Sequence, residues 1–237
     1  KGLMDLVIYT KHKPSIERIA LSTNGSASID FYNRLVEFGV NDFSISLDAC
    51  CSSTADIMAG TTSNFEHISN VIKHLSTKTY VIVGVVLDER NINELKDIIK
   101  YATSLGVHDI RIIPSAQDNR QLNIDIKTNY QILKYRLKNI REGRHIRGIK
   151  ETDCNKCHLV KDDMVVLKNK HFPCVIYMRE QGEPIGEITP TTTIQKIREE
   201  RKAWFEKTNC YEDPICKNNC LDVCIDHNNV VELINEK

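Results

Sequence analysis

The residues with the clearest capacity for chemistry are cysteines. The 237-residue chain has nine, and seven of them fall between positions 154 and 224. In order, these seven are Cys154, Cys157, Cys174, Cys210, Cys216, Cys220 and Cys224. The total is odd and the first residues do not read as a secretion signal, so disulfides are a poor expectation and metal or cluster ligation is the better one. A small, loop-rich segment with this many thiols is expected to be held together by metal.

The spacing leaves the identity of the metal open. All-thiolate sites suit zinc or iron–sulfur clusters. Only Cys154-x2-Cys157 has the spacing of a zinc knuckle, whereas the later gaps of five, three and three residues fit cluster ligation better. The string CNKCH at 154–158 also matches the attachment pattern of c-type haem, but the five further cysteines and the lack of an export signal count against a cytochrome. His158 is then expected at the surface or behind the ligands.

Three more candidates follow a short apolar segment in the first half. Asp48 comes directly after the expected strand 43–47, where a carboxylate would face the ligand side of a sheet, although a loop cap is an equally good role. Cys50 and Cys51 come next. An active-site role is open to both, but ordinary reduced thiols in a loop are the simpler interpretation.

Alternating helical and strand patterns over residues 1–117 must position these groups. Helices are expected over 26–38, 64–75 and 91–105, the last with Asn91 and Glu94 as a capping box. Strands are expected over 43–47, 80–87 and 109–113. The apolar run YVIVGVVL at 80–87 is typical of a strand buried on both faces of a parallel sheet. The first residues read as a helix already under way, so the chain is expected to be a fragment.

An internal repeat supports a series of βα units. FGVNDFSI at 38–45 parallels LGVHDIRI at 105–112, and in both a helix would end on glycine and turn straight into a strand. Repeated units of this kind build a parallel sheet, open or closed into a barrel, with ligands bound at the carboxyl ends of its strands. A long helix over 125–142 would follow. A change in composition near 145–153 then marks a second domain.

The composition does not indicate a nucleic-acid or membrane partner. The formal net charge is zero, so neither nucleic acid nor a membrane is an expected partner. Basic residues between 134 and 147 recur at helical spacing and read as a solvated face. No stretch approaches the about 20 apolar residues of a membrane span, and a cytoplasmic location is expected.

The order of these motifs resembles that of the radical SAM enzymes. STNG at 22–25, SISLDA at 44–49, GVV at 84–86 with NINEL after it, and LGVHDIRIIPSAQ at 105–117 look like the later βα units of that family's partial barrel. The cysteine-rich half resembles a SPASM/twitch auxiliary-cluster domain, with FPC at 172–174 and IGEI at 185–188 before the final cysteine string. The likeness covers nearly the whole chain. Each barrel motif alone is weak, but their order together with the cysteine string is fairly specific.

The resemblance implies an α/β fold. A partial (βα) parallel barrel of radical SAM type would be followed by a small cysteine-rich cluster-binding domain. The expected domains are the C-terminal part of the barrel at 1–122, a linking helix at 123–150 and the auxiliary iron–sulfur domain at 151–237.

The resemblance also implies cofactor sites. S-adenosylmethionine (AdoMet) would lie along Thr23, Asn24, Ser46 and Asp48, with the backbone around Ile113 and Pro114 near the adenine. One auxiliary [4Fe–4S] cluster would use Cys154, Cys157, Cys174 and Cys220, and a second would use Cys210, Cys216 and Cys224. The family pattern has one more cysteine where this chain has Lys207. A non-cysteine ligand, an open iron and the absence of a second cluster all stay open.

Two features depart from the family. Neither the C-x3-C-x2-C loop that holds the AdoMet-cleaving cluster nor the glycine-rich strand end that binds the AdoMet amino group is in these residues, and both would precede Lys1. In addition, Ala59 stands before Gly60 where relatives often have arginine. Alanine cannot pair with a carboxylate, so a contact to cofactor or substrate would be lost.

The implied activity is that of a radical SAM oxidoreductase that modifies a peptide or protein through a 5′-deoxyadenosyl radical. The auxiliary clusters would bind substrate or carry electrons, and a reductant such as ferredoxin or flavodoxin would supply them. This fragment alone is expected to be inactive. The alternatives are a zinc-stabilised binding module on a βα domain and a degenerate electron-transfer iron–sulfur protein. The bond formed in the substrate and the oligomeric state cannot be read from the residues.

Overall fold

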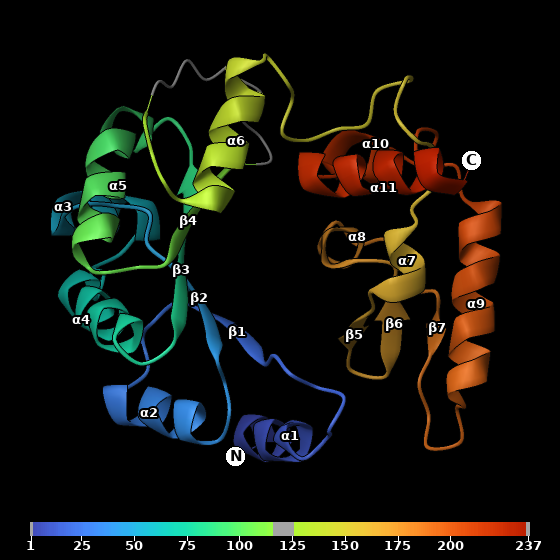
Figure 1. The fold of residues 1–237 in the computed structure, drawn as a ribbon, viewed down its shortest axis with the longest axis horizontal. Coiled ribbons are helices and arrows are strands. Elements are labelled where there is room, and N and C mark those ends of the chain that lie inside the picture. The colour runs from blue at the N-terminus through green and yellow to red at the C-terminus, as the bar shows by residue number, and fades with distance from the viewer. Residues whose placement is uncertain (1, 116–125, 236–237) are drawn as a thin grey trace. The chain divides into compact units, whose positions relative to one another are not determined.

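The computed structural model describes residues 2–115 and 126–235 and divides into two compact units, 1–144 and 145–237 (Figure 1). The first unit, here called the sheet unit, holds the expected βα segments. The second, here called the cysteine unit, holds the seven clustered cysteines. Each unit is described by itself.

The sheet unit is built on four parallel strands in the order β1-β2-β3-β4. They are β1 (Ala20–Thr23), β2 (Asp42–Ser46), β3 (Tyr80–Leu87) and β4 (Asp109–Pro114). The register pairs Thr23 with Ile45, Ser46 with Gly84 and Leu87 with Pro114, so the carboxyl ends of the strands share one edge. The parallel α/β sheet expected from the apolar runs is confirmed. Its closure into a barrel stays a prediction.

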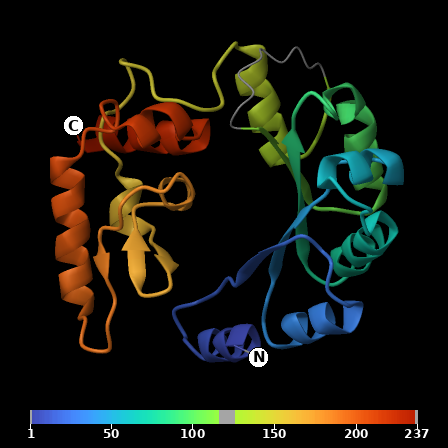
Figure 2. The same ribbon diagram turned by 180° about the vertical axis from the view of Figure 1, so that it is seen from behind.

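Helices surround this sheet. They are α1 (Gly2–Lys11), α2 (Ile29–Glu37), α3 (Ser52–Ala59), α4 (Phe65–Ser76), the 3-10 turn η1 (Ile92–Glu94), α5 (Leu95–Ser104) and α6 (Gln131–Arg141). Figures 1 and 2 show α4 and α5 along one face of the sheet. Their apolar stripes account for this position, because Val71, Ile72 and Leu75 of α4 and Ile98 of α5 are fully buried.

The repeated glycines end their helices as expected. Gly39 (φ +113°) follows α2 and Gly106 (φ +79°) follows α5, and both occupy the left-handed region that favours glycine. The amide of Gly39 donates to the carbonyl of Val36, and that of Gly106 to the carbonyl of Thr103, each at 3.0 Å. In both cases the chain then turns directly into a buried strand.

Two sequence-based expectations were wrong. Asn91 and Glu94 do not form a capping box, because the side chain of Asn91 caps no helix and the Glu94 carboxylate accepts hydrogen bonds from Thr54 instead. The helix expected over 125–142 begins only at Gln131, while position 125 lies outside the described residues. Asp109 accepts hydrogen bonds from the amides of the first turn of α6, at 3.0 Å from Ile132, so this helix packs on β4 as part of the sheet unit.

The cysteine unit has short elements around a small antiparallel sheet in the order β5-β6-β7. The strands are β5 (Val165–Leu167), β6 (Lys170–Phe172) and β7 (Gly186–Glu187), and the helices are α7 (Leu159–Asp162), α8 (Val175–Arg179), α9 (Ile194–Lys207), α10 (Pro214–Asn219) and α11 (Asp222–Asn235). In the described ranges of both units, no helix combines the length and the apolar character needed to cross a bilayer.

One buried arginine joins the parts of the cysteine unit. Arg201 of α9 is only 5% exposed. Its guanidinium donates to the carbonyls of Val160 (2.7 Å) and Phe172 (3.0 Å), and also to that of Asp163. Helix α9 is thereby fixed against α7 and against the end of β6, directly before Pro173 and Cys174.

Candidate functional site

A cavity of about 290 Å³ opens at the carboxyl edge of the sheet unit. Its lining includes three of the residues expected along AdoMet, namely Asn24, Ser46 and Asp48. The remainder comes mostly from α3, the loop that follows it and the start of α4. Ligand sites in parallel sheets occur at this edge, and the volume is at the lower end of the range of about 300–1,000 Å³ for small-molecule sites.

The turn after β1 is ordered by its own side chains. The hydroxyl of Thr23 hydrogen-bonds the phenol of Tyr32 at 2.9 Å and accepts from the amide of Gly25 at 3.2 Å. Asn24 accepts from the hydroxyl of Ser26 at 2.8 Å. Thr23 therefore stabilises the turn and is absent from the lining of the cavity, whereas Asn24 reaches it.

Asp48 links two strands as well as lining the cavity. Its carboxylate accepts from the amide of Val86 in β3 at 2.6 Å, and burial raises the pKa of this carboxyl group above its usual value. The fully buried amide of Asn91 donates to the carbonyls of Asp48 (2.9 Å) and Val86 (2.8 Å) and accepts from the amide of Asp88 (3.0 Å). Asp48 therefore bonds to the backbone of β3 and also lines the cavity.

The last two expected AdoMet residues lie elsewhere on the same edge. Ile113 and Pro114 end β4, opposite Val86 and Leu87 of β3. Both are half-buried, and neither is among the lining residues of the cavity. Ala59, in contrast, lies in its wall at the end of α3, so the departure noted in the sequence does fall on this cavity.

Four thiols of the cysteine unit form one neighbourhood. Cys220 and Cys224 share a side-chain hydrogen bond, and Cys157 and Cys174 interact electrostatically with both. Burial, followed by the nearby Cys210, raises the pKa of Cys157 to about 12. The thiol of Cys174, at the N-terminus of α8, accepts from the amide of Tyr177 at 3.4 Å.

The remaining three thiols adjoin this group. Cys210 and Cys216 share a side-chain hydrogen bond, which lowers the pKa of Cys210 and raises that of Cys216. Cys154 interacts with Cys210 and with Glu232 of α11. The sulfur of Cys154 also accepts from the amide of Lys156 at 3.4 Å.

Sequence reasoning missed Glu232. The ligand atoms of Cys154, His158 and Glu232 lie within 4.8 Å of one another. The ring of His158 is buried and hydrogen-bonds the Glu232 carboxylate at 2.7 Å, so this histidine is not at the surface. Glu232 is 74 residues from His158 in sequence and further from Cys154, and no local pattern marks it.

The donor set of the cysteine unit fits metal or cluster binding. The small buried apolar cluster of this unit consists of Ile149, Cys210 and Ile225. Cys157, Cys216 and Cys220 are among the residues packed against it. Cysteines thus occupy the place of core residues. All-thiolate sites suit iron–sulfur clusters and zinc.

No protein-family model matches the chain, and no curated protein matches it. Among solved structures, native anSMEcpe with bound AdoMet matches at a TM-score of 0.58 and 16% identity, covering 99% of this chain and 78% of that one. Native anSMEcpe with bound AdoMet and the Kp18Cys peptide matches at 0.55 and 15%, covering 99% and 80%. At these identities the likeness shows a shared fold alone.

Proposed function

We propose that the chain is part of a radical SAM enzyme that modifies a peptide or protein and carries auxiliary iron–sulfur clusters. The observation that carries this proposal is the gathering of seven thiols in one unit of a chain whose whole length shares its fold with an AdoMet-bound enzyme. A peptide is bound in the second similar structure, and this supports a peptide substrate.

The cavity at the carboxyl edge of the sheet is the proposed AdoMet site. Asn24 and Ser46 would bind polar groups of the cofactor, and Asp48 would hold the strand ends at the spacing that the cavity requires. Ile113 and Pro114 would contact the cofactor only beyond the walls of this cavity.

The electrostatic interactions among the thiols support a partition that differs from the one implied by the family resemblance. Cys157, Cys174, Cys220 and Cys224 would hold one auxiliary cluster, because Cys224 interacts with the other three. Cys154, Cys210 and Cys216 would hold a second, for which Glu232 beside Cys154 supplies a further donor.

Bound together, a reduced iron–sulfur cluster and AdoMet supply a 5′-deoxyadenosyl radical, which abstracts hydrogen from a substrate. The residues of this chain would orient AdoMet at the edge of the sheet and keep water from it. Those of the cysteine unit would hold the auxiliary clusters that bind substrate or accept electrons. A ferredoxin or flavodoxin reductant and a cytoplasmic location remain predictions.

Anaerobic reconstitution of the 237-residue chain with iron and sulfide tests the proposal. A brown protein with stoichiometric iron and sulfide and broad visible absorption is expected. A colourless protein that binds stoichiometric zinc instead would overturn it and would favour a zinc-stabilised module.

Double variants test the partition of the thiols. Cys220→Ser/Cys224→Ser is expected to lose no more iron than Cys220→Ser alone, because both residues would hold the same cluster. Cys220→Ser/Cys154→Ser is expected to lose more iron than Cys220→Ser alone. The opposite pattern would support the partition implied by the family resemblance.

A further inference from the structure

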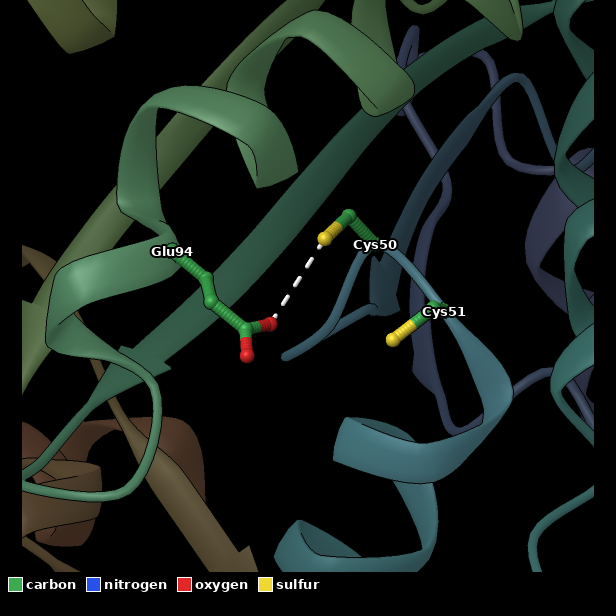
Figure 3. Close-up of side chains that lie close together, drawn as sticks. All are labelled: Cys50, Cys51 and Glu94. Carbon is green, nitrogen blue, oxygen red and sulfur yellow. Dashed lines mark hydrogen bonds between the residues drawn. The ribbon is translucent and has the colours of Figure 1, made fainter.

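Two adjacent cysteines and one carboxylate converge outside the proposed cofactor sites. The sulfur atoms of Cys50 and Cys51 and a carboxylate oxygen of Glu94 all lie within 4.8 Å of one another. Figure 3 shows both sulfur atoms directed toward the side on which the Glu94 carboxylate lies. Cys50 is in the loop after β2, Cys51 is the residue before α3, and Glu94 ends η1 after β3. The group therefore lies on the carboxyl edge of the sheet.

A buried hydroxyl holds the carboxylate in this position. Thr54 is 4% exposed, and its hydroxyl donates to both oxygens of Glu94, at 2.9 and 2.8 Å. The thiol of Cys51 lies 3.4 Å from the same hydroxyl oxygen. Thr54 thus orients the carboxylate, as hydrogen-bonding partners commonly do for metal ligands.

The spacing of the donor atoms suits a tetrahedral ion. A zinc ion at about 2.3 Å from sulfur and about 2.1 Å from oxygen sets its sulfur and oxygen ligands about 3.6 Å apart. The measured distance from the sulfur of Cys50 to the carboxylate of Glu94 is 3.6 Å. The sulfur of the third donor, Cys51, lies within 4.8 Å of both other ligand atoms.

The two thiols differ in pKa. Burial and the Glu94 carboxylate raise the pKa of Cys50 to about 11, whereas hydrogen bonds with Ser53 and Thr54 lower that of Cys51 to about 7. Binding would release the thiol protons to solvent.

We propose that Cys50, Cys51 and Glu94 form a binding site for one divalent ion of the zinc class. Two thiolates and one carboxylate leave a fourth position for water or a ligand group, as in open zinc sites. Ala49 and Ala55, next in sequence to Cys50 and Thr54, line the cavity at the same edge, so the segments that carry these residues also contribute to its wall. The site does not depend on the cysteine unit or on radical chemistry.

Zinc counting on the full chain tests the site. After loading under anaerobic, reducing conditions and desalting, the unaltered chain is expected to retain one more zinc equivalent than Cys50→Ser/Cys51→Ser. Loading with cobalt(II) is expected to give a difference spectrum between these two proteins with a thiolate-to-cobalt charge-transfer band. The seven clustered thiols are present in both proteins, so their contribution cancels.

Milder variants distinguish the loss of a metal ligand from the loss of the folded structure. Glu94→Gln keeps the size of the side chain and is expected to weaken zinc binding at this site at least about tenfold, and Thr54→Val about 10-fold to 100-fold. Glu89→Gln, an exposed change of the same charge nearby, is expected to leave binding unchanged. Equal zinc content and identical cobalt spectra in the unaltered chain and Cys50→Ser/Cys51→Ser would overturn the proposal. So would a Cys50–Cys51 disulfide that persists under these conditions.

Discussion

The sheet unit and the cysteine unit bury very different sets of side chains. The twelve largest fully buried side chains, among them Phe43, Ile45 and Ile112, all lie in the sheet unit. In the described part of the cysteine unit, the buried apolar residues are Ile146, Ile149, Val160, Phe172, Ile197, Cys210 and Ile225. One of these seven is itself a proposed ligand.

The two units therefore depend on different sources of stability. Burial of apolar surface contributes roughly 25 cal/mol per Å² to the folding free energy. A four-stranded sheet covered by helices buries a large apolar area. A unit with few apolar side chains must obtain its folding free energy elsewhere, and metal binding is the source that its thiols offer.

Removal of metal is expected to have the largest effect and to act on one unit alone. Binding of structural zinc in comparable small domains contributes on the order of 10 kcal/mol. Anaerobic chelation of the loaded protein should therefore expose residues 145–237 to protease while residues 1–144 stay protected. Limited proteolysis with mass spectrometry measures this. Equal protection of both units after complete removal of metal would contradict the comparison.

Truncation of the sheet core is the converse experiment. Phe43 is fully buried in β2, so Phe43→Ala is expected to lower the free energy of unfolding of the sheet unit by about 3–5 kcal/mol. Val86→Ala, at a side chain 43% exposed in β3, should change it by less than about 0.5 kcal/mol. Urea unfolding followed by circular dichroism measures both. A matching loss of iron from Phe43→Ala would show that the two units do not unfold separately.

Arg201 tests how far the cysteine unit depends on polar contacts. Arg201→Met removes the donors to four carbonyls and is expected to destabilise this unit by about 2–3 kcal/mol. Arg198→Met, at an exposed position one turn earlier on α9, is the matched control and should have little effect. Hydrogen exchange of residues 145–235 measures the difference. Equal exchange in the two variants would show that Arg201 does not stabilise the cysteine unit.

Much of the sheet unit could be predicted from local patterns. The apolar run at 80–87 is β3 without a change of boundary, and the two glycines at 39 and 106 end their helices as expected. These features depend on side-chain periodicity and on backbone conformation, which adjacent residues largely determine. The gathering of the thiols in a unit of their own also followed from their clustering in sequence.

The residues that were missed act through contacts between distant segments. Glu94 stands three residues after Asn91, as a capping-box glutamate would, yet its partner is Thr54, 40 residues earlier. Arg201 lies in a charged helix, but it is buried and donates to carbonyls of two distant segments, α7 with its C-cap and β6. Which thiols share a cluster stays a prediction.

Asn91 has a consequence for the thermodynamics of binding at the carboxyl edge. Its buried amide connects the loop that carries Asp48 to the segment that leads into Glu94. These two loops are therefore ordered before a ligand arrives. A cofactor or ion that binds beside them loses less conformational entropy than it would on free loops, so more of its contact energy remains as affinity.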